Sequence, residues 1–282
     1  MEVFIFMNND FMLYPNFKTK ALTFSYDDGP KEDRHFIELL NKYGLKGTFN
    51  LNSGLMPEKK NENDRVSLEE ICSLYEGHEV AVHTVHHPFL EKMPISAVTT
   101  EILDDRRNLE KYLSYPVRGM AYPFGTYDNH VFDACRACGI KYSRTVEAHR
   151  GFDLPTEWLK MPSTCHHADN KLFELAEKFV NSAPKKESRF TTNGWLFYVW
   201  GHTYEFRTSE DWTRIEKFFE LVSNRDDVWY ATNIEIYDYI EAYRSLEYSV
   251  GLDKVYNPTA VDVFLIHEEK QYKIPAGKTV IF

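Results

Sequence analysis

The stretch Thr23-Phe-Ser-Tyr-Asp-Asp-Gly-Pro30 has the composition of a buried β-strand that ends abruptly in two carboxylates and a turn. Two adjacent acids at the end of a buried strand are costly unless a cation or a shared proton stabilises them. A solvated turn would explain Asp-Gly-Pro alone, but it explains the doublet of Asp27 and Asp28 less well. We therefore interpret this stretch as a core strand that carries a candidate functional site.

Outward from this strand, short β-like runs alternate with amphipathic helices, which is the pattern of parallel βα units. Repeated units of this length close naturally into an α/β barrel, whose chemistry lies on the loops that follow the strands. A doubly wound open sheet is the competing architecture. The predicted strands are Leu22 to Asp27, Gly47 to Leu51, Glu79 to His83, Gly119 to Pro123, Lys141 to Val146, Trp195 to Trp200 and Val228 to Thr232.

The pattern changes after Leu246, where short alternating runs replace the helices. Such runs, separated by turn residues such as Pro275-Ala-Gly277, are typical of small β-sheets. We therefore predict two parts, a βα barrel over residues 1–246 and a small C-terminal β appendage over residues 247–282.

The composition, with 43% hydrophobic and 27% charged residues among 282, is that of a globular protein. A net charge of −10 without a basic stripe argues against nucleic acid as a partner. No apolar run approaches the roughly 18 residues that span a bilayer, which argues against a membrane partner. The first residues lack the pattern of a signal peptide, so the sequence predicts a cytoplasmic location. It predicts no oligomeric state.

A second polar cluster, His83-Thr-Val-His-His-Pro88, lies at the end of the third predicted strand. His83 and His87 are four residues apart, so one helical turn or a tight loop would aim both imidazoles at one point. Such a pair beside a carboxylate is the ligand set of a catalytic zinc site, which keeps an open position for water. A lone histidine is more often structural, but three in five residues favour a metal. We expect His86 to point elsewhere.

A further histidine, His202, follows the predicted strand Trp195 to Trp200, and Gly201 would let the backbone turn sharply there. Taken singly, His202 could equally be a surface loop residue. However, the first, third and sixth predicted strands all deliver ionisable groups at their C-terminal ends, which is the face where a barrel holds its active site.

The four cysteines are few for this length, and we predict reduced thiols. Cys135 and Cys138 have the spacing of half a zinc site, which Cys165, His166 and His167 could complete. The first two cysteines also follow a helical apolar period, so a buried helix face is the simpler interpretation.

Together these motifs resemble the polysaccharide deacetylases, the carbohydrate esterases that share the NodB homology domain. Residues 23–30 are similar to the family's first motif and His83 to Pro88 to its second, while Tyr122-Pro-Phe-Gly125 and Trp200-Gly-His202 resemble its third and last. The resemblance covers the chain from Phe17 to Leu246. It implies a distorted seven-stranded (β/α) barrel.

The resemblance also implies a divalent metal, usually Zn²⁺, held by Asp28, His83 and His87. Asp27 would be the general base for the metal-bound water, and His202 would be the acid that protonates the leaving amine.

Two positions depart from the family pattern. The family has an arginine that steers the base two residues before the third-motif proline, where this chain has Ala121, and Arg118 or Arg144 could substitute for it. The family's leucine in the acetyl pocket is replaced by Trp200.

The remaining predicted site residues support the acid or bind substrate. Asp153 and Trp158 are candidates for the family's aspartate and tryptophan that support the acid. A backbone N–H near Phe124 would join the metal in holding the oxyanion. Sugars stack on aromatic faces, although aromatic residues chiefly fill cores. The predicted substrate-binding residues are Tyr122, Pro123, Phe124, Trp200 and Tyr204.

The predicted function is a metal-dependent hydrolase that removes N-acetyl groups from an amino sugar or oligosaccharide. One alternative is an O-acetyl glycan esterase, in which the leaving alcohol needs less help from His202. Another is a catalytically inactive, metal-containing carbohydrate-binding protein, suggested by the missing arginine at Ala121. The presence of Asp27 and His202 argues against this last alternative, because a pure binding protein needs neither a base nor an acid.

Overall fold

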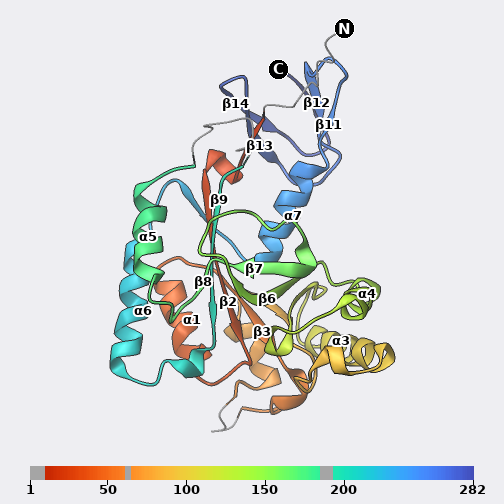
Figure 1. Ribbon diagram of the computed structural model, residues 1–282, viewed down its shortest axis with the longest axis vertical. Helices are drawn as coiled ribbons and strands as arrows, with labels where there is room; N and C mark the ends of the chain where they lie inside the picture. Colours follow the sequence, from red (N-terminus) through yellow and green to blue (C-terminus); the bar gives the residue numbers. More distant parts are fainter. Residues whose placement is uncertain (1–9, 61–64, 185–192) are drawn as a thin grey trace.

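The main sheet of the computed structural model is parallel throughout and is wrapped by helices (Figure 1). The structure describes residues 10–60, 65–184 and 193–282. Within these ranges the strand order is β7-β6-β5-β4-β3-β2-β9-β8, and β10 also pairs with β2. The strands are β2 (Lys20–Asp27), β3 (Gly47–Leu51), β4 (Glu79–Val82), β5 (Gly119–Ala121), β6 (Tyr142–Ala148), β7 (Met161–Ser163), β8 (Cys165–His166), β9 (Trp195–Gly201) and β10 (Val228–Tyr230).

A short segment, residues 161–166, closes this sheet into a barrel. Its first half, β7, pairs with β6, and its second half, β8, pairs with β9. Only Thr164 separates the two halves, and its backbone N–H donates to the Tyr198 carbonyl oxygen at 2.8 Å. Among the described residues the ring therefore has seven strands, counting this segment as one, which confirms the predicted barrel.

One of the seven strands predicted for the barrel was wrong. The segment 161–166 was not predicted, and β10 was counted in its place. β10 pairs only with Lys20 to Leu22, the first residues of β2, and lies off the ring.

Helices cover the outside of the barrel, with α1, α5 and α6 on one side and α3 and α4 on the other (Figure 1). Helix α4 buries Val131, Phe132, Ala134 and Cys135, as its helical apolar period predicted, and all four cysteines are free thiols. The helices are α1 (Asp33–Lys42), α2 (Ile71–Leu74), α3 (Ile95–Glu110), α4 (Asn129–Ala137), α5 (Leu172–Asn181), α6 (Ser209–Val222) and α7 (Asn233–Arg244).

Strand β2 is buried on both faces, and its alternation decides what each face carries. Leu22, Phe24 and Tyr26 belong to the apolar core between sheet and helices. The residues between them are polar and point into the barrel, where Ser25 and Asp27 both accept hydrogen bonds from Asn50. Strand alternation thus directs the Asp27 carboxylate into the barrel.

The barrel interior is filled by a hydrogen-bonded polar network rather than by apolar side chains alone. The Asn233 side chain donates to the Tyr198 hydroxyl at 2.7 Å, and its backbone N–H donates to Thr48. Thr48 and Tyr142 each donate to the buried carboxylate of Glu79 at 2.8 Å. Every one of these groups has a hydrogen-bond partner, which offsets part of the cost of burying the network.

Buried carboxyls make the stability of this fold pH dependent. Burial outweighs the hydrogen bonds of Glu79, Asp33 and Asp105 and raises the pKa of each to about 7. Unfolded carboxyls titrate near pH 4, so the folded chain binds more protons between about pH 4 and pH 7. The stability from these groups is therefore fully present at low pH and lost as the pH rises through 7.

The buried imidazoles of His78, His83 and His167 have lowered pKa values and act in the opposite direction, so the contribution of one carboxyl is measured as a difference between variants. Between pH 5 and pH 8 we expect the melting temperature of metal-free Glu79→Gln, which cannot ionise at this position, to fall less or rise more than that of the native chain. Glu38→Gln on the exposed surface of α1 should match the native chain. Calorimetry in chelator measures both, because metal binding has its own pH dependence. An unchanged slope in Glu79→Gln would contradict the assignment.

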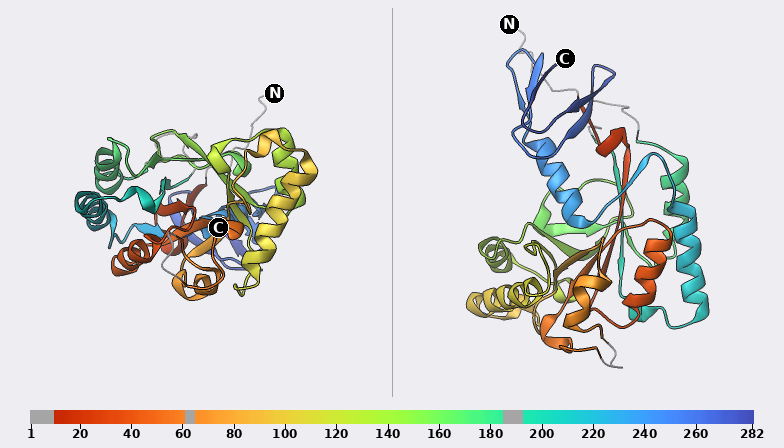
Figure 2. Two further views of the ribbon diagram at one scale, coloured as in Figure 1. Left: turned by 90° about the horizontal axis from the view of Figure 1, so that it is seen from below. Right: turned by 180° about the vertical axis from the view of Figure 1, so that it is seen from behind.

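Two small antiparallel sheets lie at the end of the barrel where β2 begins, away from the end where β2 delivers Asp27 (Figures 1 and 2). One of them includes β1 near the start of the chain, which pairs with β13. The division at residue 246 stays a prediction. No helix among the described residues combines the length and hydrophobicity needed to cross a bilayer. The strands are β1 (Phe11–Leu13), β11 (Glu247–Tyr248), β12 (Lys254–Tyr256), β13 (Val263–His267), β14 (Lys270–Ile274) and β15 (Thr279–Ile281).

Candidate metal and catalytic site

Asp27 and Asp28 separate sharply in their surroundings although they are adjacent. Asp27 is the last residue of β2 and is 2% exposed. Asp28 has a φ of 76°, a left-handed conformation that is costly for a residue with a Cβ, and its backbone N–H donates to the Asn50 carbonyl oxygen at 2.9 Å. Strain of this kind is concentrated at functional sites, and here both carboxylates lie within 4.0 Å of His83 Nε2.

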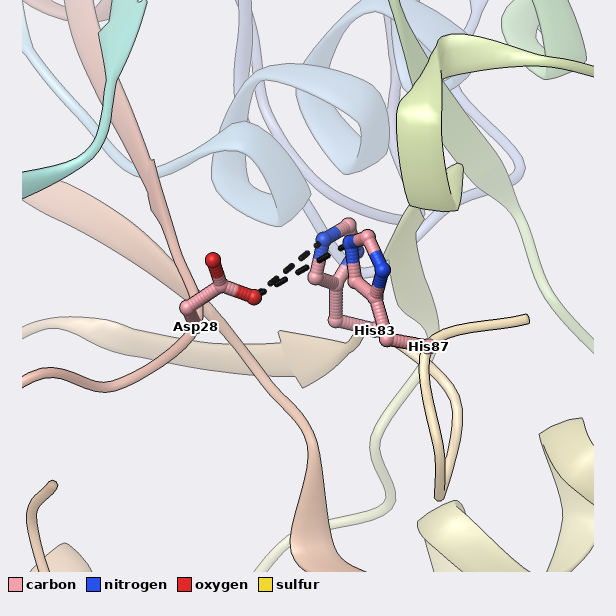
Figure 3. A group of neighbouring side chains, drawn as sticks. All are labelled: Asp28, His83 and His87. Atoms are coloured by element: carbon pink, nitrogen blue, oxygen red, sulfur yellow. Dashed lines mark ion pairs between the residues drawn. The ribbon is translucent and has the colours of Figure 1, made fainter. Parts of the chain in front are cut away.

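The two predicted histidines meet the Asp28 carboxylate (Figure 3). Asp28 Oδ1 lies 3.9 Å from His83 Nε2 and 4.0 Å from His87 Nε2. The loop after β4 is tight rather than helical, since Thr84 and His87 have φ values of 67° and 56°. The Thr84 hydroxyl accepts a hydrogen bond from the His87 backbone N–H at 3.1 Å. The tight loop therefore aims both rings at one point, as predicted.

The hydrogen bond on the far side of the His83 ring fixes which nitrogen carries the proton. His83 Nδ1 lies 2.8 Å from the Ala121 carbonyl oxygen, which can only accept, so Nδ1 carries the hydrogen. The Nε2 lone pair is then directed at Asp28, which is the arrangement of a metal-binding imidazole. Burial lowers the pKa of His83 and so favours the neutral ring.

The donor set of Asp28, His83 and His87 fits a divalent metal. Two imidazole nitrogens and one carboxylate oxygen lie within 4.8 Å of one another. In a tetrahedral zinc site, ligand atoms about 2.0–2.2 Å from the ion lie roughly 3.4 Å apart, so the Asp28 oxygen is only about half an ångström too far from each imidazole nitrogen. Two nitrogens and one oxygen suit zinc better than magnesium or calcium, which prefer oxygen ligands.

Asp27 is held by two partners inside the barrel. Arg144 Nη2 donates to Asp27 Oδ2 in a buried ion pair, and Asn50 Nδ2 donates to Oδ1 at 2.9 Å. Burial would raise the pKa of Asp27, but the Arg144 guanidinium and the imidazoles of His83 and His202 outweigh it and lower the pKa. Asp27 is therefore ionised at neutral pH.

Arg144 reaches Asp27 from β6, where it pairs directly with Ala121 of β5. The resemblance to the family places an arginine at position 121, and here the neighbouring strand supplies that guanidinium through Arg144. Arg118, the other candidate, forms its ion pair with Asp238 at 2.7 Å instead. The Arg144 guanidinium also stacks on Trp200, 4.3 Å from the ring centroid.

His202 faces the same carboxylate from the end of β9, with its Nε2 3.8 Å from Asp27 Oδ2. Burial alone would lower the pKa of His202, but the carboxylates of Glu205 and Asp27 outweigh burial and raise it. Asp27 and His202 therefore have pKa values shifted in opposite directions, which is typical of a base and an acid that work together.

The predicted substrate-binding residues divide into buried and exposed groups. Tyr122 is 1% exposed and its hydroxyl donates to the Leu159 carbonyl oxygen at 3.0 Å, so its side chain belongs to the core and its prediction as a sugar contact was wrong. Pro123 is also buried. Phe124 and Tyr204 are 49% and 41% exposed, and the ring of Phe124 packs against His87. A cavity beside the site is lined by Asp28, Pro30, Lys31, Glu32, Arg65 and Tyr204.

Other candidates lie away from the site. Trp158 donates to Glu241, and Asp153 lies beside His149, so neither supports His202. His86 is an exposed partner of Glu101.

Two site residues were missed by the sequence reasoning. Asn50, the last-but-one residue of β3, carries no motif of its own. Glu205, three residues after His202, could have been found, because a carboxylate at this spacing is a capping pattern.

The fold is shared with known proteins. The chain has the fold of a Mycobacterium smegmatis protein named for the polysaccharide deacetylases (TM-score 0.57, 17% identity, 83% of this chain and 94% of that one). It also has that of the chitin deacetylase from Colletotrichum lindemuthianum (TM-score 0.51, 16% identity, 77% and 87%). These similarities show that the fold, an α/β barrel, is shared.

Sequence similarity to known proteins covers the first half of the chain. Residues 15–143 match the family described as polysaccharide deacetylase, and the match includes Asp27, Asp28, His83 and His87. The match confirms, over these residues, the resemblance seen in the motifs. A peptidoglycan-N-acetylglucosamine deacetylase from Bacillus cereus is 26% identical over 125 residues. The aligned part is 43% of this chain and 54% of that protein, so the chain spans about half the length of this curated relative.

Proposed function

We propose that this protein is a metal-dependent hydrolase that removes N-acetyl groups from an amino sugar or oligosaccharide. The observation that carries the proposal is the position of Asp27 Oδ2, which lies 4.0 Å from the metal-type ligand His83 and 3.8 Å from His202. A base, a ligand set and an acid thus converge at one end of the barrel, where barrel enzymes hold their active sites.

The residues divide the chemistry among them. Asp28, His83 and His87 would hold the divalent metal, most commonly zinc, which when bound polarises a carbonyl and makes water more acidic. The ionised Asp27 carboxylate would accept the proton of the attacking water, and Arg144 would hold that carboxylate in place.

His202 would complete the reaction by giving its Nε2 proton to the departing nitrogen, which is otherwise a poor leaving group. The backbone N–H of Phe124 would support the oxyanion. The same machinery would release acetate from an O-acetylated sugar with less demand on His202.

The position of Arg144 argues against the alternative of an inactive binding protein. That alternative rested on the missing arginine at Ala121, and Arg144 contacts the base from the adjacent strand. The sequence similarity to a peptidoglycan-N-acetylglucosamine deacetylase from Bacillus cereus supports an N-acetylated glycan as the substrate class.

The proposal predicts that the purified, zinc-loaded protein releases acetate from N-acetylglucosamine oligosaccharides. Acetate release should stop after removal of the metal with a chelator and return when zinc is added, because only the ion polarises the carbonyl and makes water more acidic. Enzymatic detection of acetate across N- and O-acetylated sugars measures this. Glycan binding without acetate release from any of them would contradict the proposal and support a binding protein.

A further inference from the structure

One carboxylate oxygen, Oε2 of Glu205, lies at the centre of three histidine side chains. Glu205 ends the short 3₁₀ helix Thr203–Glu205 that follows His202. Its Oε2 accepts a hydrogen bond from the His202 backbone N–H at 3.1 Å and lies 3.5 Å from the Nδ1 of the same residue. The Nε2 atoms of His166 and His167 lie 3.1 and 3.4 Å away.

This cluster could be read as a second metal site, since ligand atoms of His166, His202 and Glu205 lie within 4.8 Å of one another. The hydrogen bond on the far side of His166 argues otherwise. Its Nδ1 accepts the backbone N–H of Ala168 at 3.1 Å, so in the neutral ring the proton is on Nε2 and points at Glu205. His83 shows the opposite arrangement, with its lone pair directed at Asp28. The cluster around Glu205 is therefore built to share protons with a carboxylate.

We propose that Glu205 is a positioning residue that orients His202 for proton donation, and that His166 holds Glu205 in place. This inference rests on the proposed function. The His202 ring lies between two carboxylates, with Nδ1 facing Glu205 and Nε2 facing Asp27. A proton held on Nδ1 leaves Nε2 as the nitrogen that meets the substrate.

The arrangement is local, because Glu205 follows His202 by three residues. Its carboxylate accepts a hydrogen bond from the His202 backbone and also faces the His202 ring, so one short turn fixes the position of both groups. The other titratable groups around His202 are Asp27 at the end of β2, Asp28 after it, His166 at the end of β8, His167 after it, and Tyr204.

The electrostatics support this role. Burial would raise the pKa of Glu205, but His166 and His202 outweigh burial and lower it well below its usual range. Glu205 is therefore ionised throughout the pH range in which His202 titrates.

The first test needs no activity. In metal-free protein with isotope-labelled histidines, the signals of His202 are assigned by their loss in His202→Asn and titrated by NMR. In Glu205→Gln we expect the pKa of His202 to fall by about one unit or more, and in Glu210→Gln, an exposed glutamate on α6, to stay as in the native chain. An unchanged pKa of His202 in Glu205→Gln would overturn the pairing.

The second test separates positioning from folding. Glu205→Gln should lower kcat on an N-acetylated sugar by roughly 10- to 100-fold with little change in KM, and should shift the alkaline limb of the pH profile down. An O-acetylated sugar should be affected less, and Glu205→Asp should restore part of the rate. Equal losses on amide and ester with an unshifted profile would show a merely structural role and overturn the inference.

Failure of the proposed function can be distinguished from failure of this inference. If the protein is not a deacetylase, the native chain releases no acetate, before any variant is compared. The NMR titration would still decide whether Glu205 pairs with His202. Zinc analysis supplies a last check. We expect about one zinc per chain in the native protein and in Glu205→Gln. A second zinc that is lost in Glu205→Gln would overturn the proton-sharing role.

Discussion

Replacing Asp27 with asparagine is expected to lower kcat for acetate release by roughly 10³-fold, because asparagine cannot accept the proton of the attacking water. The metal should remain bound, since Asp27 lies outside the set of Asp28, His83 and His87. Acetate release and zinc content measured on the same sample therefore distinguish a base from a ligand. Loss of zinc would make Asp27 a ligand, and full activity would exclude it as the base.

The same variant should also be less stable. Arg144 is 1% exposed and would lose its carboxylate partner, and breaking a buried pair in this way costs roughly 3–5 kcal/mol. Assays should therefore be run well below the lowered melting temperature, with circular dichroism to show that the fold is kept. Asp153→Asn, an exposed aspartate outside the site, is the matched control and should leave rate and stability unchanged.

Replacing His87 with alanine is expected to abolish both metal retention and acetate release. His87 supplies one of three ligand atoms, and two ligands are too few for a stable zinc site. Zinc content after dialysis should fall from about one per chain to near zero.

The neighbouring residue provides the control for this variant. His86 is an exposed partner of Glu101, so His86→Ala should keep both zinc and activity. If His86→Ala lost the metal and His87→Ala kept it, the ligand assignment would be wrong. Full acetate release by metal-free His87→Ala would contradict metal dependence itself.

The site residues that could be predicted are those at, or just after, the C-terminal end of a strand. Asp27 ends one strand, and His83 and His202 follow the ends of two others, so the barrel brings them together once the strands are recognised. Their convergence follows from periodicity and position. Their roles in the reaction stay predictions.

The parts that could not be predicted depend on how strands are aligned. Arg144 replaces a missing guanidinium because it lies directly across from Ala121, and the sequence gives no register between β5 and β6. Tyr122 is an aromatic residue of the type that stacks on sugars, yet the turn of the chain after β5 places its ring in the core.

The strand 161–166 was missed for a related reason. It is two pairings of three and two residues, β7 and β8, with Pro162 in the first. Neither half is long enough to show an alternating pattern. Its partners also lie on different strands, a relationship that only the closed ring reveals.

The short segment 161–166, which closes the barrel, is also a place where the barrel could unfold locally. Among the described residues it alone joins β6, which carries Arg144, directly to β9, which leads to His202, and its middle is held by the hydrogen bond of Thr164. Local unfolding of this segment would separate Arg144 from His202 while the remaining parallel pairs stay intact. Amide exchange at Thr164 would therefore report the lifetime of the closed ring, which need not equal the lifetime of the folded chain.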